Sequence, residues 1–291
     1  MRAAVLGSPV IHSLSPTLHR AAYAALGLRG WSYTAVECDE TRLPDLLDGL
    51  DETWAGLSLT MPLKRAVLPL LDEVEPLASD VGGANTVVLS DGRRFGYNTD
   101  VGGMVAALAD AGVTEWSASR GAVVIGAGAT ACSALAALKE LGVREVVVAV
   151  RDTSRTGDLE AAAKRLDVAI RVDDLGSLAR SPANTCVAKT SSGAVGLVVC
   201  TVPPRAADAL VDWLSGGRHS PLVVFDVAYD PWPTRFAAVA AAGGSVIVGG
   251  FELLLHQAAR QVELMTGHPA PLAAMRAAGL AELAARSGPN T

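Results

Sequence analysis

A glycine-rich turn between a predicted strand and a predicted helix restricts the fold of this 291-residue chain more than any other stretch. The apolar run 121–125 leads directly into Gly126-Ala127-Gly128-Ala129-Thr130-Ala131, and a helix is predicted over 132–141. Glycines in this order let the backbone approach a pyrophosphate, and the helix N-terminus supplies unpaired N–H groups. The strand before the turn and the helix after it therefore predict a Rossmann-type dinucleotide-binding domain.

The end of the next predicted strand bears on the choice of dinucleotide, and it is followed by Arg151, Asp152 and, one turn later, Arg155. An acidic side chain at this point holds the ribose 2′-hydroxyl of NAD, whereas an arginine accommodates the 2′-phosphate of NADP. The two arginines favour NADP. NAD stays open because of Asp152, which could pair with an arginine, cap the next helix or repel a phosphate.

The stretch 56–64 predicts a short strand followed by a helix. Two leucines alternate with polar residues up to Thr60, and Pro62 fits the first turn of a helix. Lys64 then lies about half a turn into that helix. Ligands collect outside the carboxyl ends of strands in open α/β sheets, so Lys64 could exchange a proton with a ligand there. The alternative is a solvated helix lysine.

A pair of serines follows the first predicted strand. Ser15 stands before Pro16, which predicts a helix start with Ser15 as the N-cap. In an extended loop Ser13 would point the same way, and two such hydroxyls suit a ligand with carboxylate or hydroxyl groups. One capping serine and one loop serine is the alternative.

Two further polar side chains fall on predicted helices. Asp100 lies near a helix start, where the helix dipole favours a carboxylate, and simple capping would explain it equally well. Gln257 would lie on a mostly apolar face of the helix 251–266, where an amide requires a partner. An intramolecular hydrogen bond is the alternative to a ligand.

Composition and charge narrow the class of protein. The formal net charge of −6 and the lack of basic runs argue against a nucleic-acid partner. The scattered cysteines Cys38, Cys132, Cys186 and Cys200 show no metal-ligand spacing and are typical of free thiols, so no metal is expected. The chain opens on the strand 3–6 with no signal peptide expected, and no apolar run is long enough for a bilayer. We therefore expect a cytoplasmic protein without a membrane partner.

Seven short motifs together resemble the shikimate dehydrogenase family over nearly the whole chain. They are His-Ser-x-Ser-Pro at 12–16, Thr-Met-Pro-x-Lys at 60–64, Gly-Ala-Asn-Thr at 83–86, Asn-Thr-Asp at 98–100, Gly-Ala-Gly at 126–128, Tyr-x-Pro at 229–231 and Gly-x-x-x-Leu-x-x-Gln at 250–257. The resemblance implies reversible NADPH-dependent reduction of 3-dehydroshikimate to shikimate, in chorismate and aromatic amino-acid biosynthesis.

The resemblance also implies roles for individual residues. Lys64 and Asp100 would form the catalytic pair beside the reacting hydroxyl, which agrees with the need for a proton donor at an alkoxide. Residues that would hold the substrate's carboxylate and hydroxyls are Ser13, Ser15, Thr60, Asn85, Tyr229 and Gln257. Residues that would line the cofactor site are Gly126, Ala127, Gly128, Ala129, Thr130, Arg151, Arg155, Thr201, Val227 and Gly250.

Two α/β domains are expected: a substrate-binding catalytic domain over 1–101 plus 243–291, with a mainly parallel sheet, and an NADP-binding Rossmann domain over 102–242. The polar stretch 181–192 is expected to be a surface loop. A monomer or a homodimer is expected.

Some positions depart from the family's pattern. Val150-Arg151-Asp152 replaces Asn-Arg-Thr, residues 201–204 read Thr-Val-Pro-Pro where Thr-Ser-Ser-Gly is usual, and Ser58 replaces the commoner asparagine. Asp152 keeps open an NAD-dependent quinate/shikimate dehydrogenase. A non-catalytic paralogue that senses a ligand is the rival from a different class.

Overall fold

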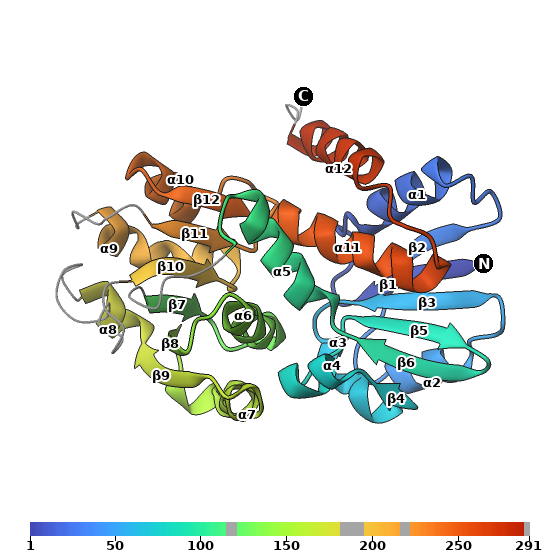
Figure 1. The fold of residues 1–291 in the computed structure, drawn as a ribbon, viewed down its shortest axis with the longest axis horizontal. Coiled ribbons are helices and arrows are strands. Elements are labelled where there is room, and N and C mark those ends of the chain that lie inside the picture. Colours follow the sequence, from blue (N-terminus) through green and yellow to red (C-terminus); the bar gives the residue numbers. More distant parts are fainter. Residues whose placement is uncertain (115–120, 181–194, 216–221, 288–291) are drawn as a thin grey trace. The chain divides into compact units, whose positions relative to one another are not determined.

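The computed structural model describes residues 1–114, 121–180, 195–215 and 222–287 of the chain (Figure 1). These residues form two compact units, one made of Met1–Gly103 with Leu254–Thr291 and the other of Met104–Leu253. Cys186 and the predicted surface loop 181–192 lie outside the described residues.

The first unit contains a six-stranded sheet with strand order β2-β1-β3-β5-β6-β4. Pairs β1–β2, β1–β3 and β4–β6 are parallel, whereas β3–β5 and β5–β6 are antiparallel. The strands are β1 (Arg2–Gly7), β2 (Ser32–Glu37), β3 (Trp54–Leu59), β4 (Glu73–Val74), β5 (Thr86–Ser90) and β6 (Arg93–Tyr97). The helices that begin in this unit are α1 (Ser15–Ala25), α2 (Leu43–Asp48), α3 (Leu63–Ala66), η1 (Leu68–Leu70), α4 (Pro76–Val81), α5 (Thr99–Asp110) and α12 (Leu272–Ser287).

Helices cover both faces of this sheet. Residues 3–7 of β1 are therefore all buried. Ala3 and Val5 pack with Tyr23 of α1 on one face, whereas Leu6 packs with Leu43 of α2 on the other. Successive side chains of a strand point to opposite faces, so a strand covered on both sides needs a continuous apolar run. Helix α12 packs beside α1 (Figure 1).

The second unit contains six strands in the order β12-β11-β10-β7-β8-β9, and all five neighbouring pairs are parallel. The strands are β7 (Gly121–Ile125), β8 (Glu145–Val150), β9 (Ala169–Asp174), β10 (Val195–Cys200), β11 (Val223–Asp226) and β12 (Val246–Gly249). The helices are α6 (Ala129–Glu140), η2 (Thr153–Arg155), α7 (Gly157–Leu166), α8 (Leu175–Arg180), η3 (Pro204–Leu210), α9 (Val211–Ser215), α10 (Arg235–Ala242) and α11 (Gly250–Thr266), which continues into the first unit. This is the Rossmann strand order, so the predicted α/β class and dinucleotide-binding fold are confirmed.

The structure differs from two local expectations drawn from the sequence. The second unit ends at Leu253 rather than at residue 242, because β12 pairs in parallel with β11 and belongs to that sheet. Helix α1 begins at Ser15 itself, and its N-cap is Leu14, whose side chain makes no capping hydrogen bond, so the prediction of Ser15 as the N-cap is wrong. The Ser13 hydroxyl instead accepts a hydrogen bond from the Ser15 backbone N–H at 3.2 Å.

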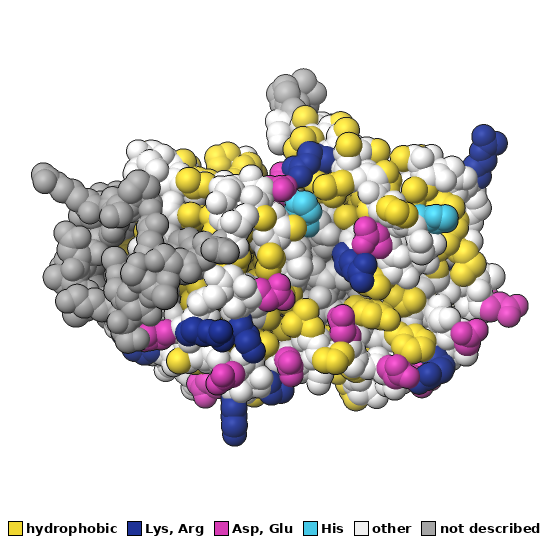
Figure 2. Space-filling view, viewed as in Figure 1, with side chains coloured by type: hydrophobic (Ala, Val, Ile, Leu, Met, Phe, Trp, Pro, Cys, Tyr) yellow, Lys and Arg dark blue, Asp and Glu magenta, His cyan; other side chains and the backbone are white. Residues whose placement is uncertain are grey.

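Among the described residues, no helix is long and apolar enough to cross a membrane. On the face shown in Figure 2, basic and acidic side chains of the described residues are interspersed. Cys38, Cys132 and Cys200 are buried, and none of these three described cysteines forms a disulfide.

Candidate active site

Three chain segments meet at one edge of the first sheet because of strand pairing. In β3 and β5, which run antiparallel, Ser58 pairs with Thr86, and Thr86 pairs with Tyr97 of β6. The end of β3, the beginning of β5 and the end of β6 therefore lie together. Residues that follow β3, precede β5 and follow β6 are brought to the same place, although they are far apart in the sequence.

Lys64 and Asp100 form an ion pair at this edge. The Lys64 Nζ donates to Asp100 Oδ2 at 2.6 Å, and the two side chains are 16% and 7% exposed. Lys64 is also held through its backbone, because its carbonyl accepts a hydrogen bond from the Ala84 N–H at 2.8 Å. Lys64 is therefore a mostly buried, ion-paired lysine, and the alternative of a solvated helix lysine is wrong.

Asp100 lies in the first turn of α5, and Asn98 sets the start of that helix. The Asn98 Oδ1 accepts hydrogen bonds from the backbone N–H groups of Asp100 at 3.1 Å and Val101 at 3.3 Å. The Asn98 amide donates to Gly83 O at 2.8 Å, which ties the helix start to the turn before β5. Asn98, rather than Asp100, therefore supplies the cap, and the Asp100 carboxylate is left to face Lys64.

Asn85 holds the second oxygen of the Asp100 carboxylate. Its Nδ2 donates to Asp100 Oδ1 at 2.8 Å and lies 3.3 Å from Gln257 Oε1. Its Oδ1 accepts the backbone N–H of Thr99 at 2.8 Å. Asn85 and Gln257 are 1% and 7% exposed, so the amides are buried and hydrogen-bonded, as buried polar groups must be.

The structure therefore brings Lys64, Asn85, Asp100 and Gln257 into one hydrogen-bonded cluster. Thr60 directly follows β3, and its backbone N–H donates to Leu6 O at 2.9 Å. Since β1 and β3 are parallel with Leu6 opposite Leu59, the segment after β1, which carries Ser13 and then Ser15 at the start of α1, leaves the sheet at this same end. Tyr229 lies in the other unit, after β11.

The predicted cofactor residues gather at the carboxyl edge of the second sheet, where β7 and β10 are neighbours and the strand order reverses. Gly126 follows β7 with φ +112°, a conformation that L side chains rarely adopt, and a Cβ there would meet Thr201 Oγ1 at 2.5 Å. Thr201 follows β10, and its hydroxyl donates to Ile125 O at 2.8 Å. The turn therefore requires glycine for its backbone and its packing.

The start of α6 fits a phosphate group. Gly128 is the N-cap, no side chain caps the helix, and a Cβ at Gly128 would meet no atom within 4 Å. The space beside Gly128 is therefore open, at the positive end of the helix dipole.

Asp152 has a local role that sequence reasoning left open. Its Oδ1 accepts hydrogen bonds from Ser154 N at 3.0 Å and Ser154 Oγ at 2.6 Å, so it caps the short helix η2. These hydrogen bonds lower the pKa of the Asp152 carboxyl. Arg151 and Arg155 are exposed on either side.

Val227 and Gly250 lie against each other in the second unit. A Cβ on Gly250 would come within 1.9 Å of Val227 O, and the Gly250 N–H donates to Ala228 O at 3.1 Å. The end of β11 and the start of α11 therefore pack backbone to backbone.

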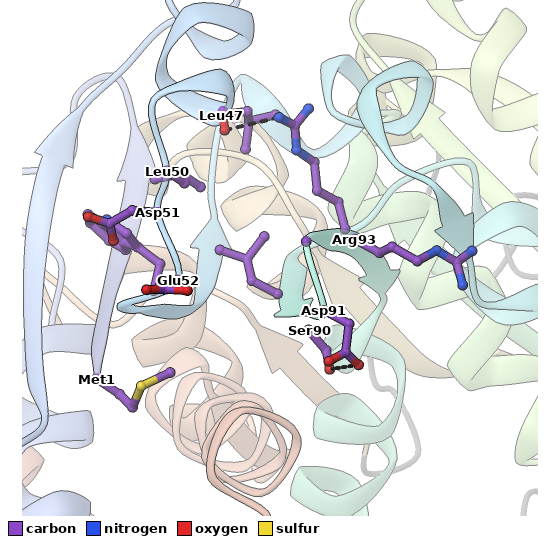
Figure 3. Close-up of a pocket in the computed structure, with 12 residues that line it drawn as sticks. Met1, Leu47, Leu50, Asp51, Glu52, Ser90, Asp91 and Arg93 are labelled. Atoms are coloured by element: carbon purple, nitrogen blue, oxygen red, sulfur yellow. Dashed lines mark hydrogen bonds between the residues drawn. The ribbon is translucent and has the colours of Figure 1, made fainter.

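A separate pocket of about 610 Å³ lies at the opposite end of the first sheet, where β3 begins (Figure 3). Its Arg93 and Arg94 form ion pairs with Glu73 at 2.6 Å and Asp48 at 2.8 Å. All the predicted site residues are described, and none of them lines this pocket. It is therefore not the candidate active site.

Sequence reasoning assigned no role to several residues that support the cluster. They include Tyr33, Asn98, Thr99 and Gln261. One signal was present: Ser58 places a hydroxyl inside a buried apolar strand, and a buried hydroxyl needs a partner. That partner is on α11, 203 positions later in the chain, so no local pattern could identify it.

Comparisons with known proteins agree over most of the chain. Residues 5–87 match the family described as shikimate dehydrogenase substrate binding domain, and residues 250–278 match shikimate 5'-dehydrogenase C-terminal domain. A shikimate dehydrogenase (NADP(+)) from Moorella thermoacetica is 36% identical over 279 residues, which cover 94% of this chain and 90% of that protein.

Two solved structures are similar in fold and sequence. The crystal structure of Mycobacterium tuberculosis shikimate dehydrogenase is 38% identical with a TM-score of 0.81, and the match covers 96% of this chain and 99% of that one. The shikimate 5-dehydrogenase of Thermus thermophilus, solved in complex with NADP(H) and shikimate, is 32% identical with a TM-score of 0.77 and coverage of 97% and 99%.

Proposed function

The chain belongs to the shikimate dehydrogenase family, and we propose from this that it catalyses the reversible NADPH-dependent reduction of 3-dehydroshikimate to shikimate. It is an NADP-dependent oxidoreductase that acts on a CH–OH group. We assign the proposed reaction to chorismate and aromatic amino-acid biosynthesis, as the family resemblance implies. The observation that supports this function best is the ion pair between Lys64 and Asp100. Its Nζ and Oδ2 atoms are 2.6 Å apart, near the carboxyl end of β3.

Proton transfer is the part of the reaction that the described residues can perform. When bound, NADPH supplies the hydride to the carbonyl carbon of 3-dehydroshikimate. We assign to Lys64 the proton that the carbonyl oxygen gains as it becomes a hydroxyl, and in the reverse direction Lys64 takes that proton back. Asp100 orients the ammonium group, since its other oxygen is fixed by the Asn85 amide.

Substrate binding is proposed for polar groups around this pair. Ser13, Ser15, Thr60, Asn85 and Gln257 belong to the first unit, and hydroxyls and amides are suitable partners for a carboxylate and ring hydroxyls. Tyr229 of the second unit is proposed as a further substrate contact.

NADP binding is proposed for the second unit. The open helix start at α6, the glycine turn and Thr201 suit the pyrophosphate side, and Arg151 and Arg155 suit a 2′-phosphate. Val227 and Gly250 are proposed to line the same site. Asp152 caps η2 by accepting from Ser154. Its carboxylate therefore has a structural function that does not require a contact with the ribose.

Oxidation assays of two substrates, each with two cofactors, test the proposal. Oxidation of shikimate and of quinate is followed at the nicotinamide absorbance band with NADP and with NAD. We expect the highest kcat/KM for shikimate with NADP. A preference for quinate with NAD would support the rival quinate/shikimate dehydrogenase, whereas substrate binding without cofactor reduction would support a non-catalytic ligand sensor.

We further infer a cytoplasmic location and a monomer or homodimer. None of the three described cysteines forms a disulfide, which fits a reducing compartment. Light scattering on the purified chain would distinguish one copy from two.

A further inference from the structure

A continuous chain of buried hydrogen bonds runs behind the candidate active site. The Tyr33 hydroxyl donates to Ser58 Oγ at 2.6 Å, and Ser58 donates to Gln261 Oε1 at 2.7 Å. Gln261 Nε2 donates to Thr86 Oγ1 at 3.0 Å, and Thr86 donates to Asn85 Oδ1 at 2.9 Å. All five side chains are buried and all belong to the first unit. This chain of hydrogen bonds ends at the Asn85 amide, which donates to Asp100.

Two backbone groups fix the direction of this chain. Gln261 Nε2 also lies 3.3 Å from the Asn85 backbone oxygen, which can only accept, so the Gln261 Oε1 must face Ser58. The Thr99 backbone N–H can only donate, so the oxygen of the Asn85 amide must face Thr99 and its nitrogen must face Asp100. Every hydrogen bond then runs from Tyr33 toward the carboxylate.

Tyr33, the first side chain of this hydrogen-bond chain, is also firmly held. The His19 ring stacks on Tyr33 with centroids 3.9 Å apart, and its Nδ1 lies 2.9 Å from Ser15 O. Burial raises the pKa of the Tyr33 hydroxyl, which therefore stays protonated and able to donate. The hydrogen-bond chain therefore begins beside His19, whose Nδ1 contacts the backbone oxygen of Ser15, a residue proposed for the substrate carboxylate.

We propose that Gln261 is a positioning residue for the proposed acid/base pair. Gln261 holds Asn85 through the backbone oxygen and through Thr86, Asn85 holds Asp100 Oδ1, and Asp100 Oδ2 holds the Lys64 ammonium group. The inference rests on the proposed function for its catalytic meaning, but the geometric effect on Lys64 can be measured without turnover.

Competitive labelling of lysines tests the geometric effect. The full chain is treated with a limiting amount of an amine-reactive reagent at constant pH, and labelling of Lys64 is measured by mass spectrometry relative to Lys139 and Lys164, which lie in the other unit. In Gln261→Met the amide is lost at similar volume. We expect the relative rate of Lys64 labelling to rise roughly threefold to tenfold, the equivalent of one lost hydrogen bond. An unchanged ratio would overturn the proposal.

Controls separate this effect from a general loss of stability. Asp100→Asn removes the negative charge that faces Lys64 and sets the upper limit of the ratio. Thr266→Val removes another hydrogen bond of α11, from Thr266 Oγ1 to Val262 O at 2.7 Å, and should leave the ratio unchanged. If Gln261→Met does not fold, Ser58→Ala removes one hydroxyl of the same chain and should raise the ratio by a smaller factor; no rise there would also contradict the proposal.

Steady-state kinetics supply the second readout. Gln261→Met should lower kcat by roughly threefold to tenfold and leave the KM for NADP unchanged, because the cofactor residues belong to the other unit. An equal kcat with a lower melting temperature would mean a merely structural role. If the wild-type chain does not oxidise shikimate at all, the proposed function fails, and the labelling ratio still decides the role of Gln261.

Discussion

Asp152 shows which of the roles left open by the sequence a side chain takes: it caps the helix that follows it. An acid at the end of the second Rossmann strand is typical of NAD enzymes, but here both hydrogen bonds of Asp152 Oδ1 come from Ser154. The sequence could show that the acid and two arginines were adjacent. It could not show which of them faces a cofactor, because that depends on the turn of η2.

Substitutions at these positions separate the two interpretations. We predict that Asp152→Ala changes the ratio of kcat/KM for NADP over NAD by less than about threefold, the equivalent of a weak hydrogen bond. Arg151→Ala should lower that ratio by about tenfold or more, since charge-assisted hydrogen bonds are stronger. Asp152→Asn keeps an oxygen for Ser154 and is the control; a large gain in NADP preference in Asp152→Ala would instead assign the acid to the ribose.

His19 gives the fold a specific sensitivity to acid. Its ring is completely buried, and burial lowers the pKa of His19 from 6.5 to about 4. Between these values the unfolded chain binds a proton that the folded chain does not, so stability is complete above pH 6.5 and is lost as the pH falls toward 4. We predict a loss on the order of 3 kcal/mol over this range from His19 alone.

Urea unfolding at pH 7 and pH 4.5 measures this contribution. His19→Phe should be less stable at pH 7, because it loses the contact with Ser15 O, but its free energy of unfolding should fall less between the two pH values. His12→Gln alters an exposed histidine and should follow the wild type. Equal acid sensitivity of wild type and His19→Phe would contradict the buried neutral ring.

At the scale of elements, helix α5 is the part on which the site depends most. Its start is fixed by Asn98, which accepts from Asp100 N and Val101 N. We predict that Asn98→Ala lowers the free energy of unfolding by about 1 kcal/mol, the usual effect of a lost N-cap. It should also lower kcat, because Asp100 lies in the freed turn.

Thermal unfolding and kinetics on the same preparation check this prediction. Asn98→Ser keeps a capping oxygen and should retain more of both stability and kcat than Asn98→Ala. Full activity in Asn98→Ala would show that the cap does not position the carboxylate.

Most elements were predictable because their patterns are local. The apolar run 121–125 and the helix predicted over 132–141 correspond to β7 and α6, which flank the glycine turn. The cap of α1 was missed because the Ser13 side chain accepts from Ser15 N, which moves the helix start by one residue. The two-residue strand β4 was missed because it is too short to show a periodic pattern.

At the scale of the molecule, the residues of the site could be named from the sequence but their arrangement could not. The family's motifs indicated Lys64 and Asp100. Their contact depends on β5 running antiparallel between β3 and β6, a pairing that is set by burial over the whole unit and not by any one segment. The buried chain through Gln261 was not predictable for the same reason, since it joins strands to a helix near the other end of the sequence.

The turnover of Lys64→Ala tests the central claim most directly, measured as shikimate-dependent reduction of NADP with shikimate binding determined by calorimetry on the same protein. Lys164→Ala, an exposed lysine of α7, is the matched control. Loss of the proton donor should lower kcat by about 10²–10⁴-fold while shikimate binding largely survives, and the control should be unaffected. Wild-type turnover in Lys64→Ala would contradict the assignment of the proton to the Lys64 and Asp100 pair.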